Sequence, residues 1–293
     1  MSLTVRGRPV RLSLAWLKPP KAGPDGSMSL FEHIAELRYR LIIIALTVLV
    51  GTIVAWFFRD YLTDIIFRPY EIAAEALKAK NPGANITLVN NGVASPFTLA
   101  LKVSALAGIL GTSPVLLYQL WAFVVPGLLA KEKKWTLIFL GSATPLFLAG
   151  VAVGYYVMPK GLVVLLGFTE NGIANLQDVN QFLSFLMRFM LVFGVAFLIP
   201  EVVLILNIVG VLKAKYLSKY RSLIIFGTFV FGAVATPSTD PFSMLALALP
   251  MTILFIVAEV IAHILDRRKA RRGIVDPVAR DRALRGLTDG EDA

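Results

Sequence analysis

The stretch "LIIIALTVLVGTIVAWFF", residues 41–58, contains no charged side chain. A helix of this length would be about 27 Å long, close to the roughly 30 Å hydrocarbon core of a bilayer. The whole chain of 293 residues is 57% hydrophobic and only 16% charged, which is far from the composition of a soluble domain. The sequence therefore predicts a protein that crosses a membrane several times.

Further apolar runs of similar length follow along the chain, which predicts an all-α polytopic membrane protein with six transmembrane helices. The candidate spans are 41–58, 97–125, 135–158, 183–207, 221–236 and 242–262. They belong to a transmembrane domain over 28–265, between a disordered basic lead (1–27) and a charged tail (266–293). The lead has no apolar run ending in a cleavage site, so no cleaved signal peptide is expected, and Met28 is an alternative start to Met1.

Lysine and arginine are distributed unequally between the two sides of these spans. Of the 29 basic residues, 22 lie in the two terminal segments and in the connectors 126–134 and 208–221. Only five lie in the connectors on the other side, and two, Lys102 and Arg188, fall inside spans. The positive-inside rule then predicts that both termini are cytoplasmic.

Some segments do not fit the simple pattern of six full-length spans. The fifth and sixth are short, so either the bilayer thins locally or the helices continue through their polar flanks, and the sequence favours neither alternative. Segment 161–169, "GLVVLLGFT", is too short to span and is expected to lie at the outer surface or to cap the helices there. The 59–96 connector contains a possible short helix, "YEIAAEALKAK".

Several kinds of chemistry are not expected. The chain has no cysteine, and its two histidines, His33 and His263, belong to no HExxH motif. His263 follows Glu259 by four residues, a spacing that favours a satisfied pair at a helix end over a metal site. No nucleotide-binding GxxxxGK[ST] motif is present, and the basic residues cluster at span ends, not in a nucleic-acid patch. We therefore expect no catalytic residues, no metal, no cofactor and no nucleic-acid partner.

The segment before the first span carries acidic residues where basic ones alone would anchor it. Ser29 and Glu32 have capping-box spacing, which predicts a helix starting near Leu30. Glu36 and Arg40 are then one turn apart on one face. Spacing alone favours a solvated ion pair, which would contribute little to stability.

Five motifs, in order along the chain, together resemble those of one known protein family. They are "HIAELRYRL" (33–41), "VASPFTLALKVS" (93–104), "PVLLYQLWAFVVPGLLAKEKK" (114–134), "FLSFLMRFMLVFGVAFLIP" (182–200) and "TPSTDPFSMLALALPMTILFIVAEV" (236–260). Together they resemble TatC, the multispan subunit of the twin-arginine protein translocase. The resemblance covers about Met28 to Leu265.

The resemblance implies a function. TatC proteins bind signal peptides with consecutive arginines and, with single-span TatA- and TatB-type subunits, export folded proteins by using the proton-motive force. It also implies the bacterial cytoplasmic (inner) membrane, contacts with anionic lipids, and a homo- or hetero-oligomer. The alternative is a proton- or ion-coupled transporter of small solutes, with Lys102, Arg188 and Glu201 along its path.

The resemblance also implies the binding site. Glu36 and the loop residue Glu132 match the family's acidic residues, and Arg38 matches its signature, where it would shape the site or meet lipid phosphates. A guanidinium can donate two parallel hydrogen bonds to one carboxylate and an ammonium cannot, which makes a requirement for arginine intelligible. Lys102 matches a family lysine, although its stem could simply extend toward the membrane surface.

The fourth span departs from the family pattern. Leu198 stands where the family has a glutamate, and Glu201 follows three residues later. Three residues turn a helix by only about 60° and advance it by about 4.5 Å. Glu201 could therefore replace the missing carboxylate, or it could lie near enough to the cytoplasmic face to be solvated.

Overall fold

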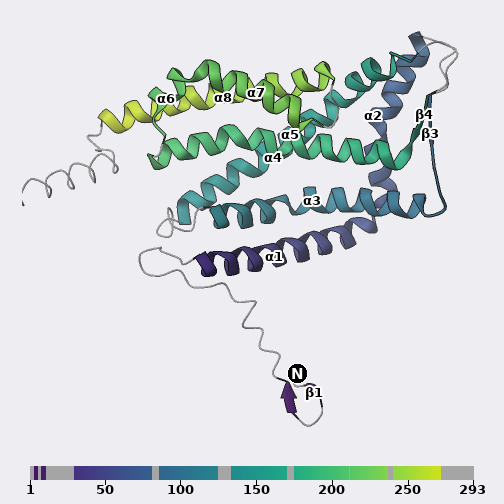
Figure 1. Cartoon of the computed structure of the whole chain (residues 1–293), viewed down its shortest axis with the longest axis horizontal. Coiled ribbons are helices and arrows are strands. Elements are labelled where there is room, and N and C mark those ends of the chain that lie inside the picture. Colours follow the sequence, from purple (N-terminus) through teal and green to yellow (C-terminus); the bar gives the residue numbers. More distant parts are fainter. Residues whose placement is uncertain are drawn as a thin grey trace, which may run out of the picture. The chain divides into compact units, whose positions relative to one another are not determined.

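The computed structural model describes residues 3–5, 8–10, 30–80, 86–124, 133–169, 175–210, 212–236 and 240–271, and most of these residues are helical (Figure 1). The helices are α1 (Leu30–Trp56), α2 (Arg59–Lys80), α3 (Ser95–Val124), α4 (Lys133–Leu166), α5 (Val179–Val209), α6 (Ala214–Lys219), α7 (Arg221–Ala235) and α8 (Pro241–Arg271). The strands are β1 (Leu3–Val5), β2 (Arg8–Val10), β3 (Ile86–Val89) and β4 (Asn175–Asp178). Among the described residues, α1, α3, α4, α5 and α8 are long and apolar enough to cross a membrane, and α7 is a shorter apolar helix. The predicted all-α class is confirmed, and the six predicted spans correspond to these five long helices and the shorter α7.

The chain forms two compact units. One comprises residues up to Phe58 together with Ser104–Thr144, and the other comprises Arg59–Val103 and everything from Pro145 onward. Each unit therefore takes part of α3 and part of α4, because the boundary falls within those two helices.

In the first unit α1 crosses α3 where both helices carry glycine. A Cβ added to Gly51 would lie 2.7 Å from Thr112 Cγ2, and one added to Gly108 would lie 2.6 Å from the backbone nitrogen of Thr52. Small residues allow two helices to approach this closely in a membrane. Trp121 of α3 stacks on Phe139 of α4, with ring centroids 3.9 Å apart. The glycine contacts fix α1 against α3, and the ring stack fixes the first part of α4 against α3.

In the second unit α5 contributes much of the core, including the fully buried Phe189 and Phe193. Helix α8 packs on α5 and on α7, and α6 packs on α8. Strands β3 and β4 pair in parallel, with Ile86 opposite Asn175, and join the segments that precede α3 and α5. The ring of Phe182 on α5 meets Tyr70 of α2 edge-on, 5.1 Å away.

The structure corrects two expectations and refines a third. Residues 161–166 do not form a separate surface segment but continue α4 beyond Pro159. Proline removes one hydrogen bond and bends a membrane helix without having to end it. The expected short helix at 70–80 is the second half of the longer α2. The two short predicted spans differ in the structure. Helix α8 continues through its polar flank to Arg271, whereas α7 stays short, with only 15 residues.

The basic lead was expected to be disordered. The structure places the short strands β1 and β2 there, paired antiparallel with Leu3 opposite Val10. The remaining residues of the lead, and Ser29 after it, lie outside the described residues. The first helix does begin at Leu30, as the capping-box spacing predicts.

Candidate functional site

The carboxylate of Glu36 is buried near the start of α1, with 4% of the residue exposed. Arg40, one turn later, donates to Glu36 Oε1 from Nε at 2.9 Å and also from Nη2. The remaining terminal nitrogen of Arg40, Nη1, donates to Oε1 of Gln119 on α3 at 3.2 Å. The pair is therefore not the solvated one that spacing alone favoured. It is a guanidinium held between two helices of one unit.

The second oxygen of this carboxylate is differently placed. Glu36 Oε2 is buried and accepts no hydrogen bond from any described residue. Nδ1 of His33 lies 3.8 Å from this oxygen, which is too long for a hydrogen bond. The His33 ring stacks on Phe123 with centroids 4.5 Å apart, so it forms an aromatic wall beside the acid. The site thus retains an unused acceptor for one more donor.

Two neighbouring charges of the same helix, Glu32 and Arg38, are exposed, whereas Glu36 is buried. Arg38 lies two residues from Glu36, which turns it to the opposite side of the helix. The loop carboxylate, Glu132, lies outside the described residues, and its place beside Glu36 stays a prediction.

Lys102 is fixed by polar partners on α5. Its Nζ donates to Ser184 Oγ at 2.8 Å and to the backbone oxygen of Asn180 at 3.2 Å. Lys102 therefore has polar partners within the protein. Lys102 and the exposed Arg188 line one cavity of about 340 Å³.

Glu201 and Leu198 both face protein on α5. Glu201 is 7% exposed and Leu198 is 8% exposed. The two positions are thus both buried, as a rotation of about 60° allows.

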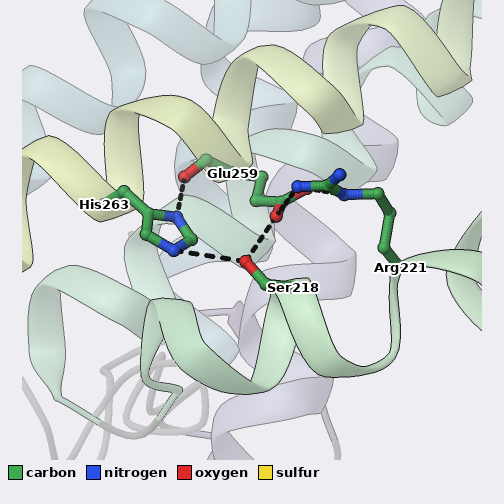
Figure 2. Close-up of polar contacts among 4 residues, drawn as sticks. All are labelled: Ser218, Arg221, Glu259 and His263. Carbon is green, nitrogen blue, oxygen red and sulfur yellow. Dashed lines mark hydrogen bonds and ion pairs between the residues drawn. The ribbon is translucent and has the colours of Figure 1, made fainter.

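A further polar cluster joins α6, α7 and α8 (Figure 2). Glu259, 2% exposed, accepts from Arg221 Nε at 2.9 Å and from Arg221 Nη2 at 2.7 Å. Ser218 Oγ donates to Glu259 Oε1 at 2.6 Å and lies 3.2 Å from His263 Nε2. His263 Nδ1 lies 3.0 Å from the backbone oxygen of Glu259. The Glu259 carboxylate is thus paired with Arg221, whereas His263 reaches only the backbone oxygen of Glu259. Among the described residues, no group of three His, Cys, Asp or Glu side chains could hold a metal ion.

The fold and these sites can be compared with known proteins. A family model described as Sec-independent protein translocase protein (TatC) matches residues 32–250. This chain belongs to the TatC family. The TatC protein of Frankia casuarinae is 41% identical over 258 residues, which cover 87% of this chain and 71% of that protein. The TatC protein of Xylanimonas cellulosilytica is 37% identical over 253 residues, which cover 86% and 90%.

The fold agrees with this assignment. The crystal structure of the twin arginine translocase receptor TatC in DDM superposes with a TM-score of 0.63 at 30% identity. The match covers 78% of this chain and 99% of that one. This TatC family member is therefore a multi-pass membrane protein and a component of a Sec-independent protein translocase.

Some partners in these clusters could not be found from sequence. Gln119 lies 79 residues from Arg40, and Arg221 lies 38 residues from Glu259. Helical spacing indicates only neighbours on the same helix, such as His33 and Arg40 around Glu36. The one available signal was a polar residue inside an apolar run, which is costly in a membrane and therefore usually partnered.

Proposed function

We propose that the chain is the signal-peptide receptor of a twin-arginine translocase. Glu36 and Glu132 bind the consecutive arginines, and Arg38 meets lipid phosphates at the rim of the site. TatA- and TatB-type single-span subunits complete the machine, which exports folded proteins with the proton-motive force. The chain lies in the bacterial cytoplasmic membrane, with both termini cytoplasmic. The similar crystal structure is that of a twin arginine translocase receptor, which supports this proposal.

The observation that carries the proposal is the state of the Glu36 carboxylate. Its Oε1 already holds one guanidinium, that of Arg40, and its Oε2 accepts no hydrogen bond within the described residues. The site is therefore shaped for a planar, multidentate donor and has room in its hydrogen bonding for another. An arginine of the signal peptide would use Oε2 or take the place of Arg40.

Addition of a second guanidinium at Glu36 Oε2 costs less than displacement of Arg40. Removing one partner of a buried ion pair costs about 3–5 kcal/mol, because a buried charge is left uncompensated. An incoming arginine that donates to Oε2 avoids this cost, because Arg40 keeps its bonds to Glu36 Oε1 and to Gln119. A lysine offers a single ammonium without the planar fork of donors.

The test is binding of a twin-arginine signal peptide to the detergent-purified protein, with a twin-lysine peptide as control. Glu36→Gln and Glu132→Gln should each weaken binding of the arginine peptide by about thirtyfold, the equivalent of one lost charge-assisted hydrogen bond. Glu32→Gln is the matched control, since Glu32 is exposed one turn earlier on the same helix. Equal binding of both peptides, or full affinity in Glu36→Gln, would refute the proposal.

A second variant tests whether Arg40 competes with the peptide arginine for the Glu36 carboxylate. Arg40→Gln removes the internal guanidinium and leaves the buried carboxylate in need of a cation. The peptide should then bind at least as tightly as to the unaltered protein, provided that the variant keeps its thermal unfolding midpoint. Weaker binding by a folded Arg40→Gln protein would show that Arg40 contacts the peptide itself.

A further inference from the structure

A cavity of about 350 Å³ opens beside the second half of α8, at the polar cluster of Figure 2. Its polar part is lined by Ser218, Arg221, Glu259, His263 and Arg267. Two guanidinium groups thus face a single carboxylate, so the cavity has a net positive charge.

The carboxylate of this cavity is already satisfied. Glu259 takes two hydrogen bonds from Arg221 and one from Ser218. The side chain of Arg221 is nevertheless 55% exposed, and Arg267 is exposed as well. Both cations therefore present donors to whatever enters the cavity, and an entering anion would not meet an unpaired carboxylate.

The apolar part of the cavity is a straight row on α8. Ile256, Val260 and Ile264 follow one another at intervals of four residues and are 42%, 53% and 46% exposed. The polar row Glu259, His263 and Arg267 has the same interval and runs beside it. The cavity is thus lined by polar and charged side chains along one side and by apolar side chains along the other.

The surroundings hold this arrangement in place. Asp266 accepts from the backbone nitrogen of Ala214 at 2.9 Å and from Asn207 Nδ2 at 3.2 Å. Leu217 of α6 packs against Phe255 and Ala262 of α8 in one apolar cluster. Because Ala214 and Leu217 fasten α6 to α8 just before Ser218, the polar lining is preorganised.

We propose that this cavity binds one anionic phospholipid. The phosphate meets Arg221, Arg267 and His263, and an acyl chain lies along Ile256, Val260 and Ile264. The cavity stands where the apolar part of α8 gives way to the basic run from Arg267 onward, which is the depth of lipid headgroups. Anionic lipids are attracted to basic segments at that depth. A small soluble anion would leave the exposed apolar row uncovered.

The test measures the thermal unfolding midpoint of the detergent-purified chain while phosphatidylglycerol is added. Phosphatidylglycerol should raise the midpoint, and phosphatidylcholine should raise it less. Arg267→Gln should shift the phosphatidylglycerol titration by about tenfold or more, as expected for one charge-assisted hydrogen bond. Arg268→Gln removes an equal charge from the next exposed residue, which does not line the cavity, and should leave the titration nearly unchanged.

Three results would overturn the proposal. Equal losses in Arg267→Gln and Arg268→Gln would show diffuse attraction of lipid to a basic surface. An equal effect of inorganic phosphate or glycerol phosphate would show a simple anion site without a place for an acyl chain. The absence of any midpoint shift with phosphatidylglycerol would show that the cavity takes no lipid. Because none of these measurements involves a signal peptide, they do not depend on the proposed receptor function.

Discussion

Gly150 of α4 lies so close to Phe193 of α5 that a Cβ on the glycine would be 2.5 Å from the Phe193 carbonyl oxygen. Gly154, four residues later in the sequence, would bring a Cβ to 3.1 Å from the Phe193 ring. The GxxxG spacing visible in the sequence is thus a true contact between two helices, and Gly150 is required there by space.

Gly150→Ala should therefore destabilise the protein. Backbone cannot move aside as a flexible side chain can, so the added methyl group should cost about 1–3 kcal/mol. The measurement is the thermal unfolding midpoint in detergent. Gly141→Ala is the control, because nothing lies within 4 Å of a Cβ at that position of the same helix. It should be neutral or stabilising, since alanine favours a helix by about 1 kcal/mol over glycine. Equal behaviour of the two variants would mean that α4 and α5 are farther apart.

The fold was more readable from sequence than the sites were. The apolar run 41–58 and its five counterparts predict the spans because a bilayer demands about 20 apolar residues, a strong and local signal. The extension of α4 through Leu166 was missed, because Pro159 suggests an end that the membrane does not enforce. The pairing of Lys102 with Ser184, 82 residues away, depends on how helices pack, which no local pattern encodes.

Tyr70 is buried in α2 at 6% exposure, and its hydroxyl has no hydrogen-bond partner among the described residues. A buried, unsatisfied polar group costs about 1–3 kcal/mol. Tyr70→Phe should thus raise the free energy of unfolding by about 1 kcal/mol or more while it keeps the edge contact with Phe182. Tyr61→Phe, at a residue 69% exposed on the same helix, should change little. Denaturant titration in detergent checks both, and a loss of stability in Tyr70→Phe would reveal a partner for the hydroxyl.

The effect of Tyr70→Phe on the free energy of unfolding should also depend on pH. Burial raises the pKa of the Tyr70 phenol above its ordinary value of 10.0. As pH rises through about 10, the phenol ionises first in the unfolded chain, which then binds fewer protons than the folded chain. The unaltered protein should lose stability over that interval, and the advantage of Tyr70→Phe should grow. An advantage that stays constant from pH 8 to 11 would contradict the raised pKa.

The membrane orientation can be tested directly because the chain contains no cysteine. Val93, Leu176 and Tyr216 are 103%, 59% and 52% exposed, so a cysteine at each should react freely where reagent reaches it. The charge distribution predicts that a membrane-impermeant maleimide labels Val93→Cys and Leu176→Cys in intact cells. Tyr216→Cys should react only after the membrane is opened. Labelling of Tyr216→Cys from outside would reverse the proposed topology.

Glu201 can be tested as the replacement for the carboxylate that Leu198 lacks. Both residues are buried on α5, and a buried carboxylate in an apolar span is costly unless it serves a polar partner or water. We expect Glu201→Leu to impair export of a folded twin-arginine substrate by tenfold or more. Glu201→Gln, which keeps the shape and the hydrogen bonding but removes the charge, distinguishes a need for charge from a need for polarity.

The decisive variant moves the carboxylate by one turn. Leu198→Glu/Glu201→Leu places it where the family pattern has it, about 4.5 Å along the helix and 60° around it. Because both positions face protein, the relocated group should reach much the same surroundings, and export should recover at least in part. Folding is checked by the unfolding midpoint of each variant in detergent. Normal export by a folded Glu201→Leu protein would remove Glu201 from the mechanism. A folded double variant without recovered export would show that the two positions are not equivalent.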